Sequence, residues 1–468
     1  MSAVQPPNVV FIMSDQHRWD CAGYAGNPIV RTPNMDRLAA EGMAFTHAGC
    51  AAPVCAPVRQ TLLTGQWPVT HGGVTLYNLS EVKTSAPLSS DFFTRRLRDA
   101  GYTLGHTGVW HVASGYGPRD VGYQETLRPE DYRKGPKPEY RHSEKMPFPP
   151  ALPEETGESV DDCRAALMTD AAIDFLTRRA DDKSPFFFSL HIRDPHPPYN
   201  LPAEYFRMYD PADVPPWPNF ADDLSGKPLM HGRLRRVWGL EDVGWDDYWA
   251  RQVAAYYGAV SLVDAQVGRV LDALDRLGIA EETMVIYTTD HGDLTGAHGM
   301  FDKHCVMYEE AVRVPLVVRW PGLTPPGRRC DAFSSHFLDL PATFLEIVEG
   351  GVPDGYEGES LLTLLQGGED DSPYRDRLLS AYHGGQFGLY SQRMLRERDW
   401  KYVWNPTDKD ELYDLGNDPG ELTNLVDAPA HAERLGSMRP RLYEEFKALR
   451  DPLMKTHWVE HMLLDGVQ

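Results

Sequence analysis

The chain contains few cysteines and no long apolar run. Its six cysteines among 468 residues are irregularly spaced, unlike a disulfide framework or a paired CxxC metal site, so we expect reduced thiols. The start of the sequence lacks the pattern of a signal peptide, and no other segment is long and apolar enough to cross a bilayer. These absences predict a cytoplasmic protein without membrane association.

Basic residues are scarce relative to acidic ones. Lys and Arg total 46 against 68 Asp and Glu, which gives a formal net charge of −22. A field of this sign repels nucleic acid and anionic membrane surfaces, although a locally positive pocket can still capture a small anion. We therefore expect a small-molecule substrate and no nucleic-acid partner.

Apolar runs at strand spacing and at helix spacing alternate along most of the chain. Buried strands are predicted at 8–13, 185–192, 282–289 and 314–319, and helices at 33–39, 251–277 and 338–348. This alternation predicts an α/β fold over residues 1–378, with a large, mostly parallel sheet sandwiched by helices. Later segments predict a smaller C-terminal α+β domain over residues 379–468, with antiparallel strands in 395–404 and 411–415 and a helix near 432–450.

Two further segments, 114–157 and 197–244, are rich in proline, glycine and charge but show no clean periodicity. They are predicted to be long loops over the active face, where substrate selectivity usually resides. The tail at 451–468 carries Trp458 and Met462 and is a candidate apolar contact for a homo-oligomer.

The most specific motif is CAPVR, from Cys55 to Arg59, followed by QTLLTG. A residue in the first turn of a helix meets unpaired N–H groups that favour an anion, and Arg59, one turn on, can reach the same anion. Taken alone, the motif also fits a buried cysteine beside a structural arginine. It resembles the sulfatase signature, CxPxR with an LLTG helix, and the resemblance covers nearly the whole chain. It implies an alkaline phosphatase-like fold and the oxidation of Cys55 to formylglycine by a formylglycine-generating enzyme.

Polar side chains follow two of the predicted strands. Asp15 and Gln16 end one strand, and Asp290 and His291 end another. In open α/β sheets, ligands bind at the carboxyl ends of the strands. The sulfatase resemblance implies one divalent metal held by Asp15, Asp290, His291 and an oxygen of modified Cys55. An oxygen-rich site favours calcium, while His291 as a ligand favours manganese.

Three further motifs carry residues suited to proton transfer or to binding negative charge. RDPHPPY resembles the family's PHxPY loop and implies that His196 protonates the leaving group. Lys303 precedes a run similar to the family's YEExxRxPL, which makes it the expected cation on the sulfate. In GVWH, His111 of the family's GKWH is retained. In the implied cycle Asp290 activates the attacking hydroxyl, and His111 later takes a proton so that sulfate is expelled.

Candidate substrate-binding residues show weaker patterns. Asn78 lies where sulfatases place a pocket Asn, and Gln16 belongs to an Asp-Gln start that phosphonate monoester hydrolases also have. Trp110 and Tyr199 fit an aryl or sugar group near the predicted mouth, but they fit ordinary packing equally well. Val109 replaces the family's sulfate-binding Lys, and the loss of such a preorganised charge typically costs about 3 kcal/mol.

The resemblance predicts hydrolysis of sulfate esters, as in arylsulfatases. An alternative is hydrolysis of phosphonate monoesters or phosphodiesters with the same machinery, because those relatives also lack the Lys that Val109 replaces. A third hypothesis is a catalytically silent relative that only binds an anion. A panel of esters separates the first two, and the mass of the peptide that holds Cys55 tests the third.

Overall fold

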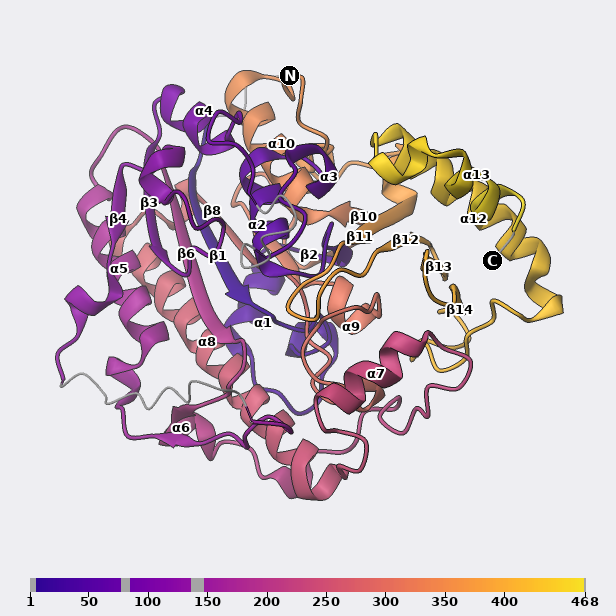
Figure 1. Ribbon diagram of the computed structural model, residues 1–468. Helices are drawn as coiled ribbons and strands as arrows, with labels where there is room; N and C mark the ends of the chain where they lie inside the picture. The colour runs from indigo at the N-terminus through magenta and orange to yellow at the C-terminus, as the bar shows by residue number, and fades with distance from the viewer. Residues whose placement is uncertain (1–5, 77–84, 136–146, 467–468) are drawn as a thin grey trace.

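The computed structural model describes residues 6–76, 85–135 and 147–466, which form a large central sheet and a smaller antiparallel sheet (Figure 1). The large sheet has eight strands in the order β10-β2-β9-β8-β1-β6-β3-β4. Neighbouring strands are parallel except at β9, which is antiparallel to both β2 and β8. The prediction of a mostly parallel sheet is therefore confirmed. The strands are β1 Asn8–Asp15, β2 Met43–Gly49, β3 Thr103–Gly108, β4 Glu125–Leu127, β6 Phe186–Pro195, β8 Thr283–Thr289, β9 Leu316–Arg319 and β10 Arg328–Ser335.

Helices cover both faces of the large sheet, as predicted (Figure 1). One face carries α1 Pro33–Glu41, α5 Arg164–Arg179 and α8 Ala250–Leu277, and the other carries α2 Cys55–Thr64, α4 Phe93–Asp99 and α10 His336–Glu349. In β1, Val10 and Ile12 pack into the core on the face covered by α8, while Phe11 and Met13 pack into the core on the face covered by α2. A strand that is covered on both sides must be apolar at successive positions, which explains the sequence of β1. Among the described residues, no helix is both long and apolar enough to span a bilayer.

The C-terminal part forms a four-stranded antiparallel sheet in the order β11-β12-β13-β14, which confirms the prediction of a smaller α+β unit. Val459 and Leu463 of the tail pack into its core, while Trp458 remains 67% exposed. The elements of this unit are β11 Arg377–Tyr382, β12 Gln392–Glu397, β13 Trp400–Trp404, β14 Glu411–Asp414, α12 Ala432–Ala448 and α13 His457–Leu464.

The two segments predicted to be long loops contain short regular elements instead. The first supplies β4, which extends the large sheet beside β3. The second contains α6 Ala203–Phe206 and α7 Leu229–Val237. β5 Glu155–Thr156 and β7 Leu201–Pro202 pair in parallel and tie the two segments together. Elements of two to nine residues are too short for a periodic pattern to show in the sequence.

Candidate active site

Four potential metal ligands meet at the carboxyl edge of the large sheet. The ligand atoms of Asp15, Cys55, Asp290 and His291 all lie within 4.8 Å of one another, and all four residues are buried. β1 and β8 are adjacent and parallel, so Asp15 and Asp290 leave the sheet at the same edge. Cys55 is the first residue of α2, and its Sγ lies 3.0 Å from His291 Nε2. The structure thus brings together the four residues that the sequence nominated as ligands.

Arg59 joins the two carboxylates of this cluster. Its Nη2 donates to Asp15 Oδ2 and its Nε donates to Asp290 Oδ2, both at 2.9 Å, and its side chain is 1% exposed. Its Nη1 donates to the carbonyl of Val109 at 2.9 Å. Arg59 lies one turn along α2 from Cys55, as the sequence indicated, and here its guanidinium holds two carboxylates in place. A shared cation offsets the repulsion between two buried anions.

Burial and local charge set the protonation of the cluster. Burial raises the pKa of the Cys55 thiol well above its usual range, so the unmodified thiol is a poor nucleophile. Burial lowers the pKa of His291 to about 4, which keeps the ring neutral, as a metal ligand must be. Burial also acts to raise the pKa of Asp290, but His291 and Arg59 outweigh it and the pKa is lowered. Carboxylate oxygens, a neutral imidazole and an atom of residue 55 form a donor set that fits a divalent cation.

A second group of polar side chains lies beside these ligands and centres on Lys303. Its Nζ donates to Gln16 Oε1 at 2.5 Å, and it lies 3.4 Å from His196 Nε2 and 3.2 Å from Asp302 Oδ1. Burial opposes the charge of Lys303, but Asp302 and other nearby anions raise its pKa. Burial, together with Lys303 and Arg193, lowers the pKa of His196 to about 3. At neutral pH a charged ammonium therefore faces a neutral imidazole.

Gln16 connects the two groups. Its backbone N–H donates to Asp290 Oδ1 at 3.1 Å, and its side-chain Nε2 donates to Asp293 Oδ2 at 2.8 Å and to Asp302 Oδ1 at 2.9 Å. Because Oε1 accepts from Lys303, each polar atom of this side chain has a protein partner. The sequence analysis did not single out Asp293 or Asp302. The only signal for them was their position two residues after His291 and directly before Lys303.

The remaining nominated residues lie at different depths. His111 follows β3, and burial lowers its pKa to about 4, so its ring is neutral. Tyr199 is buried, and its hydroxyl donates to Asp293 Oδ2 at 3.0 Å. The indole N–H of Trp110 donates to a backbone carbonyl at 2.9 Å. Asn78 lies outside the described residues. Tyr199 and Trp110 thus use their polar atoms within the protein.

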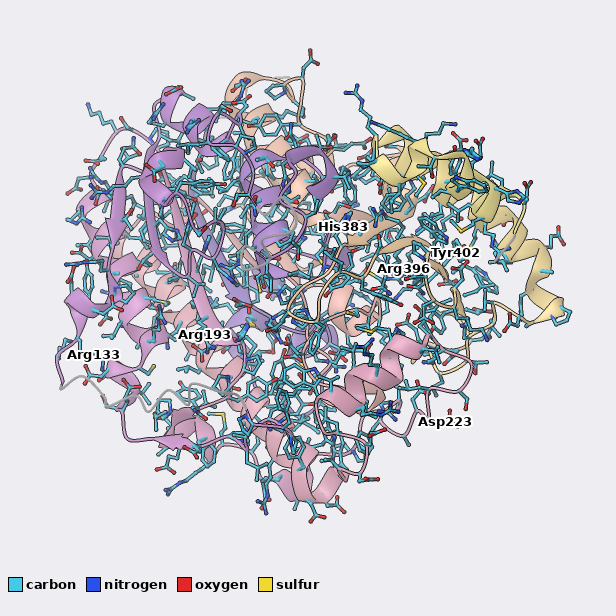
Figure 2. The ribbon with its side chains drawn as sticks, viewed as in Figure 1. Arg133, Arg193, Asp223, His383, Arg396 and Tyr402 are labelled. Atoms are coloured by element: carbon cyan, nitrogen blue, oxygen red, sulfur yellow. The ribbon has the colours of Figure 1, made fainter. Side chains whose placement is uncertain are left out.

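Arg193 is a third cation of the site, after Arg59 and Lys303, and the sequence analysis did not assign it a role there. Figure 2 shows it at the carboxyl end of β6. Its Nη2 donates to the carbonyl of Pro197 at 2.7 Å and lies 3.3 Å from His196 Nδ1. Across the described ranges, no carboxylate forms an ion pair with Arg193. The side chain of Val109, where the family has Lys, packs against the core on the α8 face. Arg193 lies within the RDPHPPY motif, but only the fold shows that its guanidinium adjoins His196.

Comparison with known proteins gives matches over almost the entire chain. A family model described as Sulfatase matches residues 7–350, and one described as N-sulphoglucosamine sulphohydrolase, C-terminal, matches residues 296–448. An arylsulfatase of Clostridium perfringens is 30% identical over 472 residues, which cover 94% of each chain. An N-acetylglucosamine-6-O-sulfatase of Bacteroides thetaiotaomicron is 25% identical over 95% of this chain and 87% of its own.

Solved structures agree with these sequence matches. The crystal structure of a phosphonate monoester hydrolase of Agrobacterium radiobacter superposes with a TM-score of 0.75 at 26% identity and covers 95% of both chains. The likeness therefore extends over both the large sheet and the C-terminal unit. One family model matches residues 7–350, which include all four candidate metal ligands, and a relative is 30% identical along nearly the full length. This chain therefore belongs to the sulfatase family.

Proposed function

We propose that this sulfatase hydrolyses sulfate esters of small molecules with residue 55 as its nucleophile, after a maturation enzyme has oxidised Cys55 to formylglycine. The observation that supports this most is the convergence of Asp15, Cys55, Asp290 and His291 at one buried point. Burial keeps the unmodified thiol neutral, because it raises the pKa of Cys55. The hydrated aldehyde of formylglycine supplies hydroxyl groups for the attack instead.

Asp15, Asp290, His291 and residue 55 would hold one divalent cation, which supplies positive charge to the attacking hydroxyl and to the ester oxygens. Two carboxylates and an oxygen at residue 55 favour calcium, and His291 makes manganese the alternative. Arg59 prepares this site, because its two hydrogen bonds of 2.9 Å fix Asp15 and Asp290. It also balances part of their charge, so the two carboxylates can share a buried space.

The remaining polar residues move protons. Asp290 takes the proton of the attacking hydroxyl at residue 55. Lys303 faces the neutral His196 ring at 3.4 Å, and the pair delivers a proton to the leaving oxygen. Since burial lowers the pKa of His111 to about 4, its neutral ring can accept the proton whose loss releases sulfate from residue 55.

Mass analysis of the peptide around residue 55, together with kinetics on 4-nitrophenyl sulfate, tests this proposal. We expect formylglycine in protein made with the maturation enzyme, and cysteine without activity in protein made in its absence. Cys55→Ser should form product once per site and then slow by about 100-fold or more, because a single hydroxyl cannot be expelled in this way. Cys330→Ser changes a buried thiol outside the cluster and should keep its activity. An active enzyme with an unmodified thiol at residue 55 would contradict the proposal.

A second activity, on phosphonate monoesters or phosphodiesters, has specific support. Val109 stands where sulfatases have Lys, and the phosphonate monoester hydrolase described above shares the fold at 26% identity. Both kinds of substrate present a tetrahedral anionic centre with one leaving group. We expect kcat/KM to be higher on 4-nitrophenyl sulfate than on 4-nitrophenyl phenylphosphonate, and the reverse ratio would make the phosphonate activity the principal one.

A further inference from the structure

The 383–391 loop joins β11 to β12 and extends from the small sheet towards the carboxyl edge of the large sheet, where the candidate metal ligands lie (Figure 1). Within it, Gln386 Nε2 lies 2.7 Å from His304 Nε2 and 3.5 Å from Asp302 Oδ2. Asp302 in turn lies 3.2 Å from Lys303 Nζ, the cation that the sulfatase resemblance predicts on the sulfate. Only one carboxylate therefore separates Gln386 from Lys303.

Hydrogen bonds to its backbone anchor the 383–391 loop to the large α/β unit and close its tip. Thr75 Oγ1 donates to the carbonyl of Gly384 at 2.8 Å. Gly385 and Gly388 exchange backbone hydrogen bonds of 3.1 and 3.0 Å, which close the tip of the loop. Gly388 adopts φ +94°, a conformation that favours glycine. These bonds give the residues at the tip a defined position relative to Lys303.

The tip offers two kinds of contact side by side. Gln386 is exposed, and its Oε1 has no hydrogen-bond partner within the described part of the chain. The adjacent Phe387 is half-buried, with its ring centroid 5.6 Å from that of Trp238 and 5.4 Å from that of His304. An amide oxygen accepts from a hydroxyl, and an aromatic ring packs against C–H groups. A hydroxylated ring of the monosaccharide type presents both kinds of group.

We propose that the 383–391 loop forms the leaving-group side of the site and that Gln386 is a specificity-determining residue for sulfate esters of hydroxylated, sugar-like rings. The inference rests on the sulfate hydrolysis proposed above. Lys303 binds the sulfate, Gln386 accepts from a hydroxyl of the departing alcohol, and Phe387 covers one face of its ring. An aryl sulfate has no hydroxyl for Gln386 to bind, so the two classes of ester should respond differently to its removal.

Gln386→Ala tests this difference on N-acetylglucosamine 6-O-sulfate and 4-nitrophenyl sulfate. We expect kcat/KM on the sugar ester to fall by about three- to tenfold, the value of one hydrogen bond, mainly through KM. On the aryl ester it should stay within about twofold. Gln366→Ala changes another exposed glutamine, at the end of α11 Leu362–Leu365, and should alter neither rate.

Calorimetric binding of the sugar ester to the wild-type sequence and to Gln386→Ala, both made without the maturation enzyme so that the ester is not turned over, separates this inference from the proposed function. If the wild-type sequence binds more tightly but the matured enzyme hydrolyses neither ester, the hydrolysis proposal is contradicted and the subsite is supported. Equal affinities of the two proteins would overturn the subsite. Equal losses on both esters would also overturn it, since Gln386 would then act only through Asp302.

Discussion

At the scale of single residues, the polar groups of the site divide into those that hold the four candidate metal ligands in place and those that face the substrate in the proposed function. Arg59 belongs to the first group, because its guanidinium is committed to Asp15 and Asp290. Lys303 and His196 belong to the second, because His196 is part-exposed and Lys303 lies against it. Substitution of the first group should remove both metal binding and turnover, whereas substitution of the second should affect only turnover.

His196→Gln should slow esters with poor leaving groups most. The pKa of His196 is lowered to about 3, so the wild-type ring is neutral over the working range and can accept a hydrogen bond from the ammonium of Lys303, which it orients towards the leaving oxygen in the proposed cycle. We expect kcat to fall by about 100-fold on an alkyl sulfate and by less than about tenfold on 4-nitrophenyl sulfate, whose leaving group needs little protonation. Equal losses on both esters would show that His196 serves binding and not proton transfer.

At the scale of elements, the loop after β8 is pressed against α9 Glu309–Val312. Gly292 N–H donates to the carbonyl of Ala311 at 2.9 Å, and a Cβ on Gly292 would lie 1.8 Å from the carbonyl oxygen of Glu310. Gly292→Ala must therefore displace the loop that carries Asp290 and His291. We expect the free energy of unfolding to fall by about 1–3 kcal/mol, and activity to be largely lost.

Gly244→Ala is the matched control for this change. Gly244 has φ −77°, and no atom lies within 4 Å of the position of an added Cβ. Its melting temperature and its activity should equal those of the wild type. If Gly292→Ala also melted normally and kept full activity, the packing of this loop would not position the ligands.

The small sheet is fastened to the main body through the buried carboxylate of Glu309. Arg396 of β12 donates to Oε2, and Lys401 Nζ of β13 lies 2.8 Å from Oε1. Burial opposes the charge, but these cations outweigh it and lower the pKa of Glu309 from 4.5 to about 2. Because the pKa is lower in the folded state, the charge stabilises the fold above pH 4.5, and this stabilisation is lost as the pH falls towards 2.

Glu309→Gln should therefore destabilise the protein most at neutral pH. We expect a loss of about 3 kcal/mol in the free energy of unfolding there, and a smaller loss in mild acid, measured by chemical denaturation. Asp376→Asn removes an exposed partner of Arg398, both 59% exposed, and should change stability by less than about 1 kcal/mol. If the loss in the free energy of unfolding of Glu309→Gln did not change with pH, Glu309 would stabilise the fold through its shape and not through its charge.

At the scale of the whole molecule, the ligand cluster joins β1, the start of α2 and the loop after β8. A cation that binds only the folded state stabilises it by about 2.7 kcal/mol at 100 times its Kd. Treatment with a chelator should therefore lower the melting temperature and abolish activity, and calcium should restore both. Asp15→Asn should remove this response to calcium. A melting temperature that is indifferent to chelator and to added calcium would contradict a metal at this site.

Much of the fold could be predicted from the sequence, because long elements carry strong patterns. The apolar runs of β1, β6 and β8 and the helical spacing of α8 appear in the structure with ends shifted by only a few residues. The short elements β4 and α7 could not be predicted, since a few residues give no periodicity. These elements are stabilised by a partner strand or by packing against other segments, and neither is visible in the local sequence.

The sequence alone nominated side chains for the proposed chemistry, because Cys55, Arg59, His196 and Lys303 stand in short motifs whose spacing is local. Only the tertiary structure decided which residues from distant parts of the chain meet these motifs. Strand order brings Asp15 and Asp290 together, and docking of the small sheet brings Gln386 beside Asp302. The reason is physical: a local pattern records how a segment folds, whereas contacts between segments depend on the packing of the entire chain.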